Sequence, residues 1–508
     1  MILQERGCRT LTGCSCAVLW ARPSRFPAVF RRFCFSGHFR PFYHNRKAVF
    51  GTMSQKTMSA ERAHTLDLTR GPITGTMLRF ALPMIAGNLL QQCYNIADTL
   101  IVGRFLGADA LAAVGSAYTL MTFLTSIFSG LCMGCGAFFA ICRGRRDDAR
   151  LRQGVFLSFF MIAVLTAVLW AAVSFWEHPI LRLLQVPETV YGLMYAYLAI
   201  IFWGIAATFL YNFFASLLRA VGNSAVPLLF LGIAAALNIV LDLVCVLVLK
   251  LGVAGAAAAT VTAQWVSGAG LMAYTLLRMP QLRVRRADCR FERALAAELA
   301  RFSLLTCLQQ SVMNFGILMV QRLVNSFGAA VMAAFAAAVK IDSFAYMPVQ
   351  DFGNAFSTFI AQNHGAGQTQ RIRDGIRSAV RVCILFCVPV SVLVFLFAKP
   401  LLTLFISPEE TEILRIGAEY LRIEGAFYCG IGVLFLLYGL YRALEQPGMS
   451  LVLTVISLGT RVGLAYTLAA IPAIGVPGIW WSVPIGWFLA DAAGVLYYVL
   501  RVQGRGRT

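Results

Sequence analysis

The sequence predicts an all-α polytopic membrane protein with twelve transmembrane helices in two homologous six-helix lobes. Three observations predict this class. Of the 508 residues, 59% are hydrophobic and only 13% are charged, whereas soluble domains carry about 25% charged residues. Apolar runs of about 20 residues recur along the chain. Short patterns of the first half also return in the second half at a nearly constant spacing, which indicates a duplication.

The apolar runs set the limits of the predicted helices. About 20 apolar residues in a helix cross the hydrocarbon core of a bilayer. Several runs are longer, so we expect those helices to tilt or to extend beyond the bilayer. The twelve predicted spans are approximately 77–102, 111–142, 154–176, 189–218, 226–249, 254–277, 302–326, 331–361, 377–398, 413–441, 448–470 and 475–500.

Basic residues in the loops predict the orientation of these spans. Alternate loops, beginning with 143–152 and ending with the tail, together carry 21 Arg. The other loops carry four basic residues and include the acidic stretch "SPEETE" at 407–412. Loops rich in Lys and Arg stay in the cytoplasm. We therefore expect a multi-pass protein of the plasma membrane with both termini in the cytoplasm.

Several function classes are disfavoured by composition. The net charge of +20 is spread over short clusters between spans, so no basic domain for nucleic acid is predicted. Cys132 and Cys135 form a C-x-x-C pattern inside an apolar run with no His nearby, which favours packing over metal binding. All five His lie in the N-terminal tail or in loops, and no nucleophile–base motif is embedded. We expect no enzyme activity, metal centre or organic cofactor.

Residues 1–52 differ from the rest of the chain, with nine Arg or Lys, one acidic residue and four Cys. They are either an Arg-rich targeting segment or translated sequence upstream of the true start, with Met53 as the initiator. We favour the second interpretation. The predicted organisation is an N-terminal extension over 1–72, an N-lobe over 73–278, a cytoplasmic linker over 279–301, a C-lobe over 302–501 and a basic cytoplasmic tail over 502–508.

The duplication is visible in matched residues. Gly107 and Gly328 are 221 positions apart, and the same offset joins Arg150 to Arg371. Further along, "LLRAVG" at 217–222 corresponds to "LYRALE" at 440–445 with an offset of 223. Each half has an even number of spans, so both halves have the same topology. We expect an axis along the membrane normal between them, with the substrate path at their interface.

Four polar residues of the first half are predicted to meet at one depth. Asp98 in the first span lies about 8 Å below its outer end, and Asp242 in the fifth lies about 12 Å below. Asn238 precedes Asp242 by one turn and shares its helix face. Thr260 in the sixth span is also about 12 Å deep. Three helices thus bring four polar side chains to one layer.

This layer has a functional and a structural interpretation. No Lys or Arg of the first six spans lies at the same depth to pair with Asp98 or Asp242. Two neighbouring acids at low dielectric either hold a proton or bind a hard cation through oxygen ligands. The structural alternative is hydrogen bonding between helices. Pro83, which precedes Asp98 in the same span, removes a helix hydrogen bond and is a candidate hinge.

The second half does not repeat these acids at matching positions. Shifting Asp98 by 221 or 222 positions gives Met319 or Val320. Lys340 and Asp342 are two residues apart and do not share a helix face, so each is expected to pair with a neighbouring helix. A functional and a structural role remain equally open for the polar residues predicted to be buried there, which are Gln309, Gln310, Asn314, Lys340, Asp342, Gln350, Asp351, Glu424 and Arg461.

From about residue 73 to 501 the chain resembles the multidrug and toxic compound extrusion (MATE) transporters. The resemblance rests on stretches such as "ALPMIAGNLLQQCYNIADTLIVGRFLGADALAAVG" at 81–115, "LLRAVGNSAVP" at 217–227 and "FIAQNHGAGQTQRIRDGI" at 359–376. It implies twelve helices in two lobes around a central cleft. It also implies efflux of cationic or amphipathic compounds, driven by inward flow of protons or sodium.

The resemblance further implies an ion site in the first lobe. The positions that match the family pattern are Asp98, Asn238, Asp242 and Thr260 for the ion, which could be Na⁺, Gln91, Tyr94, Tyr197 and Asn212 as supporting polar groups, and Pro83 as the bending proline. Some members place an acidic site in the second lobe, on spans 7 and 10. Span 7 here offers Gln309 and Asn314 but no acid, which leaves Glu424 in span 10 as the candidate.

The sequence therefore favours a monomeric secondary antiporter that exports cationic or amphipathic drugs or metabolites in exchange for H⁺ or Na⁺. In this hypothesis the two lobes rock to give alternating access, and ion uptake at Asp98 and Asp242 bends the first helix near Pro83. The alternative is a flippase for lipid-linked oligosaccharide or another lipid-linked substrate. A flippase would be expected to line its cavity with cations for pyrophosphate, and few basic residues are predicted to be buried in the first lobe.

Overall fold

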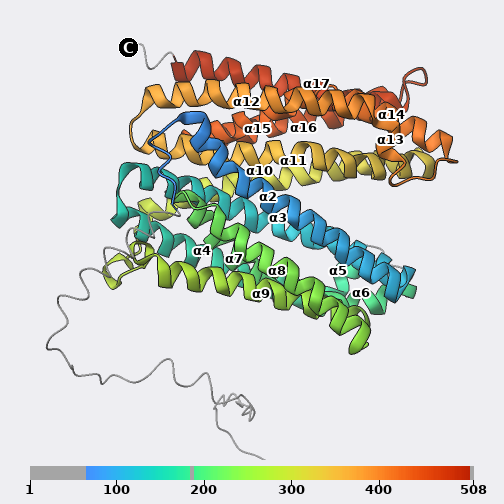
Figure 1. Ribbon diagram of the computed structural model, residues 1–508, viewed down its shortest axis with the longest axis horizontal. Coiled ribbons are helices and arrows are strands. Elements are labelled where there is room, and N and C mark those ends of the chain that lie inside the picture. The colour runs from blue at the N-terminus through green and yellow to red at the C-terminus, as the bar shows by residue number, and fades with distance from the viewer. Residues whose placement is uncertain (1–64, 184–187, 504–508) are drawn as a thin grey trace, which may run out of the picture. The chain divides into compact units, whose positions relative to one another are not determined.

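The computed structural model describes residues 65–183 and 188–503, which form long helices running side by side (Figure 1). These helices belong to one unit of the chain, Ser59–Thr508. Residues 1–52, the initiator prediction for Met53 and the tail beyond residue 503 lie outside the described residues.

The first half of the bundle runs from α2 to α9. Its long elements correspond to the first six predicted spans, and a short α5 (Glu177–Leu183) lies between α4 and α6. They are α2 (Ile73–Leu106), α3 (Ala108–Arg145), α4 (Asp148–Phe175), α6 (Glu188–Ile201) continued by η2 (Phe202–Gly204) and α7 (Ile205–Ala220), α8 (Ala225–Leu243) continued by η3 (Val244–Val248), and α9 (Gly252–Arg278).

The second half runs from α10 to α17, after two short 3₁₀ turns, η4 (Pro280–Leu282) and η5 (Arg286–Asp288). Its long elements correspond to the last six predicted spans. They are α10 (Arg293–Asn325), α11 (Ala329–Gly365), α12 (Thr369–Leu396), α14 (Thr411–Gly425) followed by α15 (Tyr428–Ala443), α16 (Pro447–Ala469) and α17 (Val476–Tyr497) continued by η6 (Tyr498–Gln503), with a short α13 (Ala398–Leu402) after α12.

The class predicted from the sequence, an all-helical membrane protein, is confirmed. Within the described ranges ten helices are long and apolar enough to cross a membrane, or eleven if α14 and α15 form one broken span. The predicted span 254–277 falls on α9, which is long enough at 27 residues but is not among these helices, because its Gly, Thr, Gln and Trp residues lower its mean hydropathy. Helices such as α3, with 38 residues, exceed the thickness of a bilayer core, as expected.

Two predicted spans depart from a regular α-helix. The span predicted over 413–441 bends by 51° between α14 and α15. Sharp kinks commonly occur at glycine, and Gly425 ends α14 where a Cβ would approach the side chain of Val394. The span predicted over 226–249 passes from α-helix into the π-helix η3 directly after Leu243.

The duplication recurs in backbone geometry and packing. Gly107 and Gly328 both adopt a left-handed φ, of 90° and 98°, just before α3 and α11. A Cβ on Gly154 would lie 2.6 Å from the ring of Phe138, and a Cβ on Gly375 would lie 2.6 Å from the ring of Phe359. These two contacts are related by the same offset that joins Gly107 to Gly328. Duplicated sequence positions therefore make duplicated contacts.

Contacts between the halves are made mainly by α2 and α3 against α10 and α11. Glycines allow the backbones to approach closely, as is common between membrane helices. Gly134 of α3 leaves no room for a Cβ beside Phe302 of α10. Gly144 faces the Gln362 carbonyl, and its repeat partner Gly365 faces the Ile141 carbonyl. A local pseudo-twofold axis therefore relates the two halves where they meet.

The end of the bundle where α2 begins and α17 ends is called the terminal face below (Figure 1). Hydrogen bonds join the halves at this end. Gln362 of α11 donates to the Ala220 carbonyl at 2.7 Å, and Arg145 contacts Glu445 at 2.6 Å. Deeper in the bundle, Asn88 donates to both carboxylate oxygens of Asp351, at 2.6 and 2.7 Å. The halves are thus held together at the terminal face in this conformation.

Candidate functional site

The structure brings together the four polar residues predicted to share one layer of the first half. Helix α8 packs against both α2 and α9. Asn238 and Asp242 of α8 therefore lie next to Asp98 of α2 and Thr260 of α9. The Asn238 amide donates to the Thr260 hydroxyl at 3.3 Å. Asn238 and Asp242 are buried, at 2% and 0% exposure. The site therefore lies inside the first half.

Most oxygens of this cluster lack a hydrogen-bond donor among the described residues. The unpartnered buried atoms are Oδ1 of Asp98, Oδ1 of Asn238 and both carboxylate oxygens of Asp242. The carboxyl groups of Asp98 and Asp242 are close enough to interact directly with each other. Buried polar atoms are normally paired, and each one left unpaired costs free energy. A group of acceptors with no donor is suited to receive a proton or a hard cation.

The local backbone explains how Asp242 is presented. It is the second-last residue of α8 and lies two residues before the π-helical turn η3. A π-turn widens the helix, and such turns occur frequently at functional sites. The Asn-x-x-x-Asp spacing places Asn238 on the same face one turn earlier, so one stretch of α8 supplies two of the cluster's side chains.

The supporting polar residues fall into two groups. Tyr197 of α6 is 7% exposed and interacts electrostatically with Asp98, Asp242 and Tyr94. Tyr94 of α2 also contacts Gln91. These three residues therefore belong to the surroundings of the acid pair. Asn212 does not join them through its amide, because that group donates to the Thr208 carbonyl of its own helix at 2.8 Å.

Pro83 lies within α2, which continues as α-helix from Ile73 to Leu106. The proline therefore removes one hydrogen bond without ending the helix in this conformation. Its role as a hinge stays a prediction, since a hinge requires a second conformation of the same helix.

A second buried acid pair lies in the other half, on helices that the sequence could not bring together. Asp342 of α11 and Glu424 of α14 interact with each other and with Arg461 of α16. Tyr428 and Tyr420 lie beside Asp342, and Tyr420 lies beside Glu424. Oδ1 of Asp342, Oε2 of Glu424, the Tyr428 hydroxyl and Nε of Arg461 are nevertheless buried without a hydrogen-bond partner among the described residues. Sequence reasoning missed these tyrosines, although Tyr420, Glu424 and Tyr428 are spaced four residues apart. That spacing could have identified one polar face.

The remaining polar residues predicted for the second half are dispersed. Lys340 is exposed, with its ammonium 5.9 Å from the ring of Phe405, so the prediction of a buried lysine was wrong. Its position continues the exposed face of α11, one turn after the exposed Ala336. Asp351 bonds to Asn88 of the first half. Gln309 is buried and Asn314 half-buried on α10, and in the described part of the chain no hydrogen bond joins them to Asp342 or Glu424.

Comparison with known proteins identifies the family. The MatE family model matches residues 83–244 and then matches again at 303–467. Together these ranges cover more than half of the chain. The chain belongs to the MATE family of multidrug efflux transporters. The two separate matches also agree with the duplication, since one family unit accounts for each half.

Curated MATE relatives are matched by this chain over nearly their whole length. It is 31% identical over 443 residues to the probable multidrug resistance protein YpnP of Bacillus subtilis, covering 85% of this chain and 96% of the relative. It is 26% identical over 445 residues to a protein of Shewanella oneidensis named as an FAD transporter, covering 85% and 95%. The MATE membership, and with it a transport rather than an enzymatic role, therefore applies to the 85% of the chain that these relatives cover.

Solved MATE structures share the fold. One, described as the outward-facing conformation of a multidrug resistance MATE transporter, aligns with a TM-score of 0.81 at 23% identity and covers 87% of this chain and 98% of its own. This likeness establishes the architecture of the helices.

Proposed function

We propose that this MATE transporter is an antiporter that exports cationic or amphipathic compounds in exchange for H⁺ or Na⁺. The coupling ion binds at Asp98 and Asp242, with Asn238 and Thr260 as neutral oxygen ligands. The observation that carries the proposal is the set of buried oxygens on Asp98, Asn238 and Asp242 without donors. A bound ion would satisfy them.

Charge supports a small cation at this position. Two carboxylates share the cluster, and among the described residues each is influenced by its burial and by the other carboxylate, not by a Lys or Arg. One proton shared by the pair, or one Na⁺ held by carboxylate, amide and hydroxyl oxygens, would lower the repulsion between them. Because both ions suit an oxygen site, the proposal covers both.

Alternating access would couple this ion to the substrate. We take the terminal face as cytoplasmic, because its loops carry the excess of Arg. The described conformation is then closed to the cytoplasm by bonds such as Gln362 to Ala220. Ion binding favours one lobe arrangement and substrate the other, and this difference in affinity is what coupling requires. Pro83 lets α2 bend as the acid pair is neutralised.

An anionic amphiphile is a second candidate substrate class, and includes the lipid-linked substrates of a flippase. The specific observation is Arg442, 4% exposed, whose guanidinium donates to Asn354 at 3.1 Å, to Ser357 at 3.4 Å and to the sulfur of Met133. All three partners are neutral, so among the described residues this buried charge between the halves has no carboxylate bonded to it. A phosphate-bearing substrate would supply an anion.

Transport in proteoliposomes tests both candidates. A cationic dye and a phosphate-bearing flavin are loaded separately, and inward pH and Na⁺ gradients are imposed one at a time. We expect efflux of the dye under at least one gradient, and loss of that dependence in Asp98→Asn and Asp242→Asn. Wild-type gradient dependence in both variants would overturn the ion site. Export of the flavin alone would favour the second candidate.

A further inference from the structure

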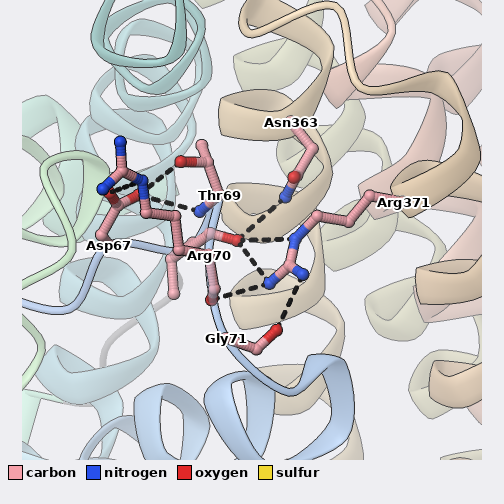
Figure 2. A network of polar contacts seen from close by, with 7 residues as sticks. Asp67, Thr69, Arg70, Gly71, Asn363 and Arg371 are labelled. Atoms are coloured by element: carbon pink, nitrogen blue, oxygen red, sulfur yellow. Dashed lines mark hydrogen bonds and ion pairs between the residues drawn. The ribbon is translucent and has the colours of Figure 1, made fainter.

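The segment before the first helix lies between the two halves at the terminal face (Figure 2). The sequence places residues 1–72 in an extension, yet Leu68 has 0% exposure. We call Leu66–Gly71 the strap. Asp67 shapes its turn by accepting a hydrogen bond from the Thr69 amide at 3.0 Å. The strap is therefore an ordered part of the bundle.

The second half holds the strap by its backbone carbonyls. The Arg371 guanidinium of α12 donates to the Gly71 carbonyl at 2.8 Å, to that of Arg70 at 2.9 Å and to that of Leu68 at 3.2 Å. Asn363 of α11, which has 0% exposure, also donates to the Leu68 carbonyl, at 3.2 Å. Figure 2 shows both side chains converging on the strap.

The first half holds the other end of the strap. The Leu66 amide donates to the Gly222 carbonyl at 3.0 Å. Gly222 adopts φ +92°, and a Cβ there would overlap the Leu66 carbonyl. Both the backbone angle and the close approach therefore require glycine. In the second half the matching position is Glu445, also left-handed at φ 63°. Its side chain contacts Arg145 across the interface.

The duplication shows that Arg371 has a counterpart. Arg371 lies over the ring of Phe359 at 5.4 Å, and its repeat partner Arg150 lies over the ring of Phe138 at 6.0 Å. Arg150 reaches across to Glu298 in α10, the first long helix of the second half, at 2.6 Å. Arg371 reaches across to the segment that leads into α2, the first helix of the first half. Each arginine thus ties one half to the start of the other.

We infer that Arg371 is a positioning residue for transport, because it holds the strap across the two halves and so keeps the terminal face closed. The strap is bonded to the first half at Gly222 and to the second half at Asn363 and Arg371. When the halves separate at this face, one of the two attachments has to break. The strength of the Arg371 attachment therefore sets how readily the face opens.

The two repeat-related contacts differ in chemistry. Arg150 uses a carboxylate, whose attraction is screened by salt. Arg371 uses several neutral carbonyls fixed in one geometry, which match the planar fork of a guanidinium better than an ammonium. We therefore expect Arg371→Lys to be impaired although it keeps the charge, and closure by the strap to depend little on ionic strength.

Site-resolved cysteine labelling tests the inference in nanodiscs, where both faces are accessible. Cys142 of α3 is buried near the inter-half contact at this face, whereas Cys289 is exposed and Cys383 is buried within the second half. Maleimide labelling of each is quantified by peptide mass spectrometry. In Arg371→Ala, and separately in Gly222→Ala, we expect labelling of Cys142 to rise roughly five-fold or more, and in Arg371→Lys by less. Cys289 and Cys383 should label as in the wild type.

The matched control is Arg373→Ala, which removes an exposed arginine two residues away on the same helix and should leave Cys142 unchanged. The inference is overturned if Cys142 labels at the wild-type rate in both Arg371→Ala and Gly222→Ala. It is also overturned if Cys383 labelling rises in parallel, since that indicates general loosening. The inference about Arg371 rests on the proposed function in one respect, which is that the terminal face opens during transport. The labelling needs no ion gradient, so failure of ion coupling would leave its result intact.

Discussion

The two halves each bury a pair of acids, and the pairs differ in what surrounds them. In the first half, Asp98 and Asp242 face an amide and a hydroxyl, and three of their four carboxylate oxygens are buried without a donor among the described residues. In the second half, Oδ1 of Asp342 and Oε2 of Glu424 also lack a donor among the described residues, but the charge of Arg461 acts on both acids. Among the described residues, one fold thus holds an acid pair on which no Lys or Arg acts and an acid pair on which Arg461 acts. The comparison teaches that burial of acids alone does not define an ion site, because an arginine side chain can supply the positive charge that a bound ion would otherwise supply.

The largest effect is expected from neutralising the first pair. Asp98→Asn with Asp242→Asn should reduce gradient-driven efflux on the order of 10- to 100-fold, because the coupling ion loses its charged ligands. Asp342→Asn with Glu424→Gln should leave gradient dependence in place, because the charge of Arg461 already acts on that pair in place of an ion. Efflux rates in proteoliposomes measure both. Equal losses in the two double variants would remove the distinction between the pairs.

Removing the cation of the second pair is expected to affect stability. Arg461→Gln removes a positive charge that acts on two buried acids, and leaving a buried polar group uncompensated costs about 1–3 kcal/mol. Urea or thermal unfolding in detergent measures the loss. Arg415→Gln removes an exposed arginine of α14 and serves as the control, with a change of less than about 0.5 kcal/mol expected. A small loss in Arg461→Gln would mean that the second pair is compensated differently.

A smaller effect is expected from the neutral ligands of the first pair. Thr260→Val removes the acceptor for the Asn238 amide, and one hydrogen bond contributes about 0.5–1.5 kcal/mol. Efflux should therefore fall by roughly three- to ten-fold, without loss of coupling. Thr262→Val is the matched control, because that exposed hydroxyl bonds to Ala258 of its own helix. An equal fall in Thr262→Val would point to α9 packing instead of the ion site.

The smallest effect concerns Glu445, outside the spans. His364, whose Nε2 lies 3.7 Å from Oε1 of Glu445, and the charge of Arg145 lower the pKa of Glu445 from the ordinary 4.5 despite partial burial. The Glu445 carboxylate therefore stabilises the closed terminal face fully above pH 4.5, and this stabilisation is lost as the pH falls through the lowered pKa of Glu445. Exposed ion pairs contribute about 0–1 kcal/mol, so Glu445→Gln should raise Cys142 labelling less than Arg371→Ala does. A larger rise would show that this pair, and not the strap, dominates closure.

Spacing along single helices made part of this arrangement predictable. The one-turn spacing of Asn238 and Asp242, and the equal depths of Asp242 and Thr260, placed three members of the first cluster together. The constant offset between matched positions revealed the duplication, which contacts such as Arg150 with Phe138 and Arg371 with Phe359 reproduce.

Other features depend on packing between helices that sequence spacing does not determine. Asp342, Glu424 and Arg461 come from three helices, so only their arrangement in space shows that they lie close enough to act on one another. The bend after Gly425 falls inside one predicted span, and no proline between 413 and 441 marks its position. The strap has no apolar period, and its bonds use backbone carbonyls, which carry no signal in the sequence.

The central claim is that the first acid pair, and not the second, binds the coupling ion. Equilibrium binding of a cationic dye to the purified transporter, measured across pH and Na⁺ concentration, tests it most directly, because competition between ion and substrate is reciprocal. We predict that dye affinity in the wild type falls as H⁺ or Na⁺ rises, that Asp98→Asn with Asp242→Asn removes this dependence, and that Asp342→Asn with Glu424→Gln retains it. Dependence that survives the first double variant and disappears in the second would contradict the claim.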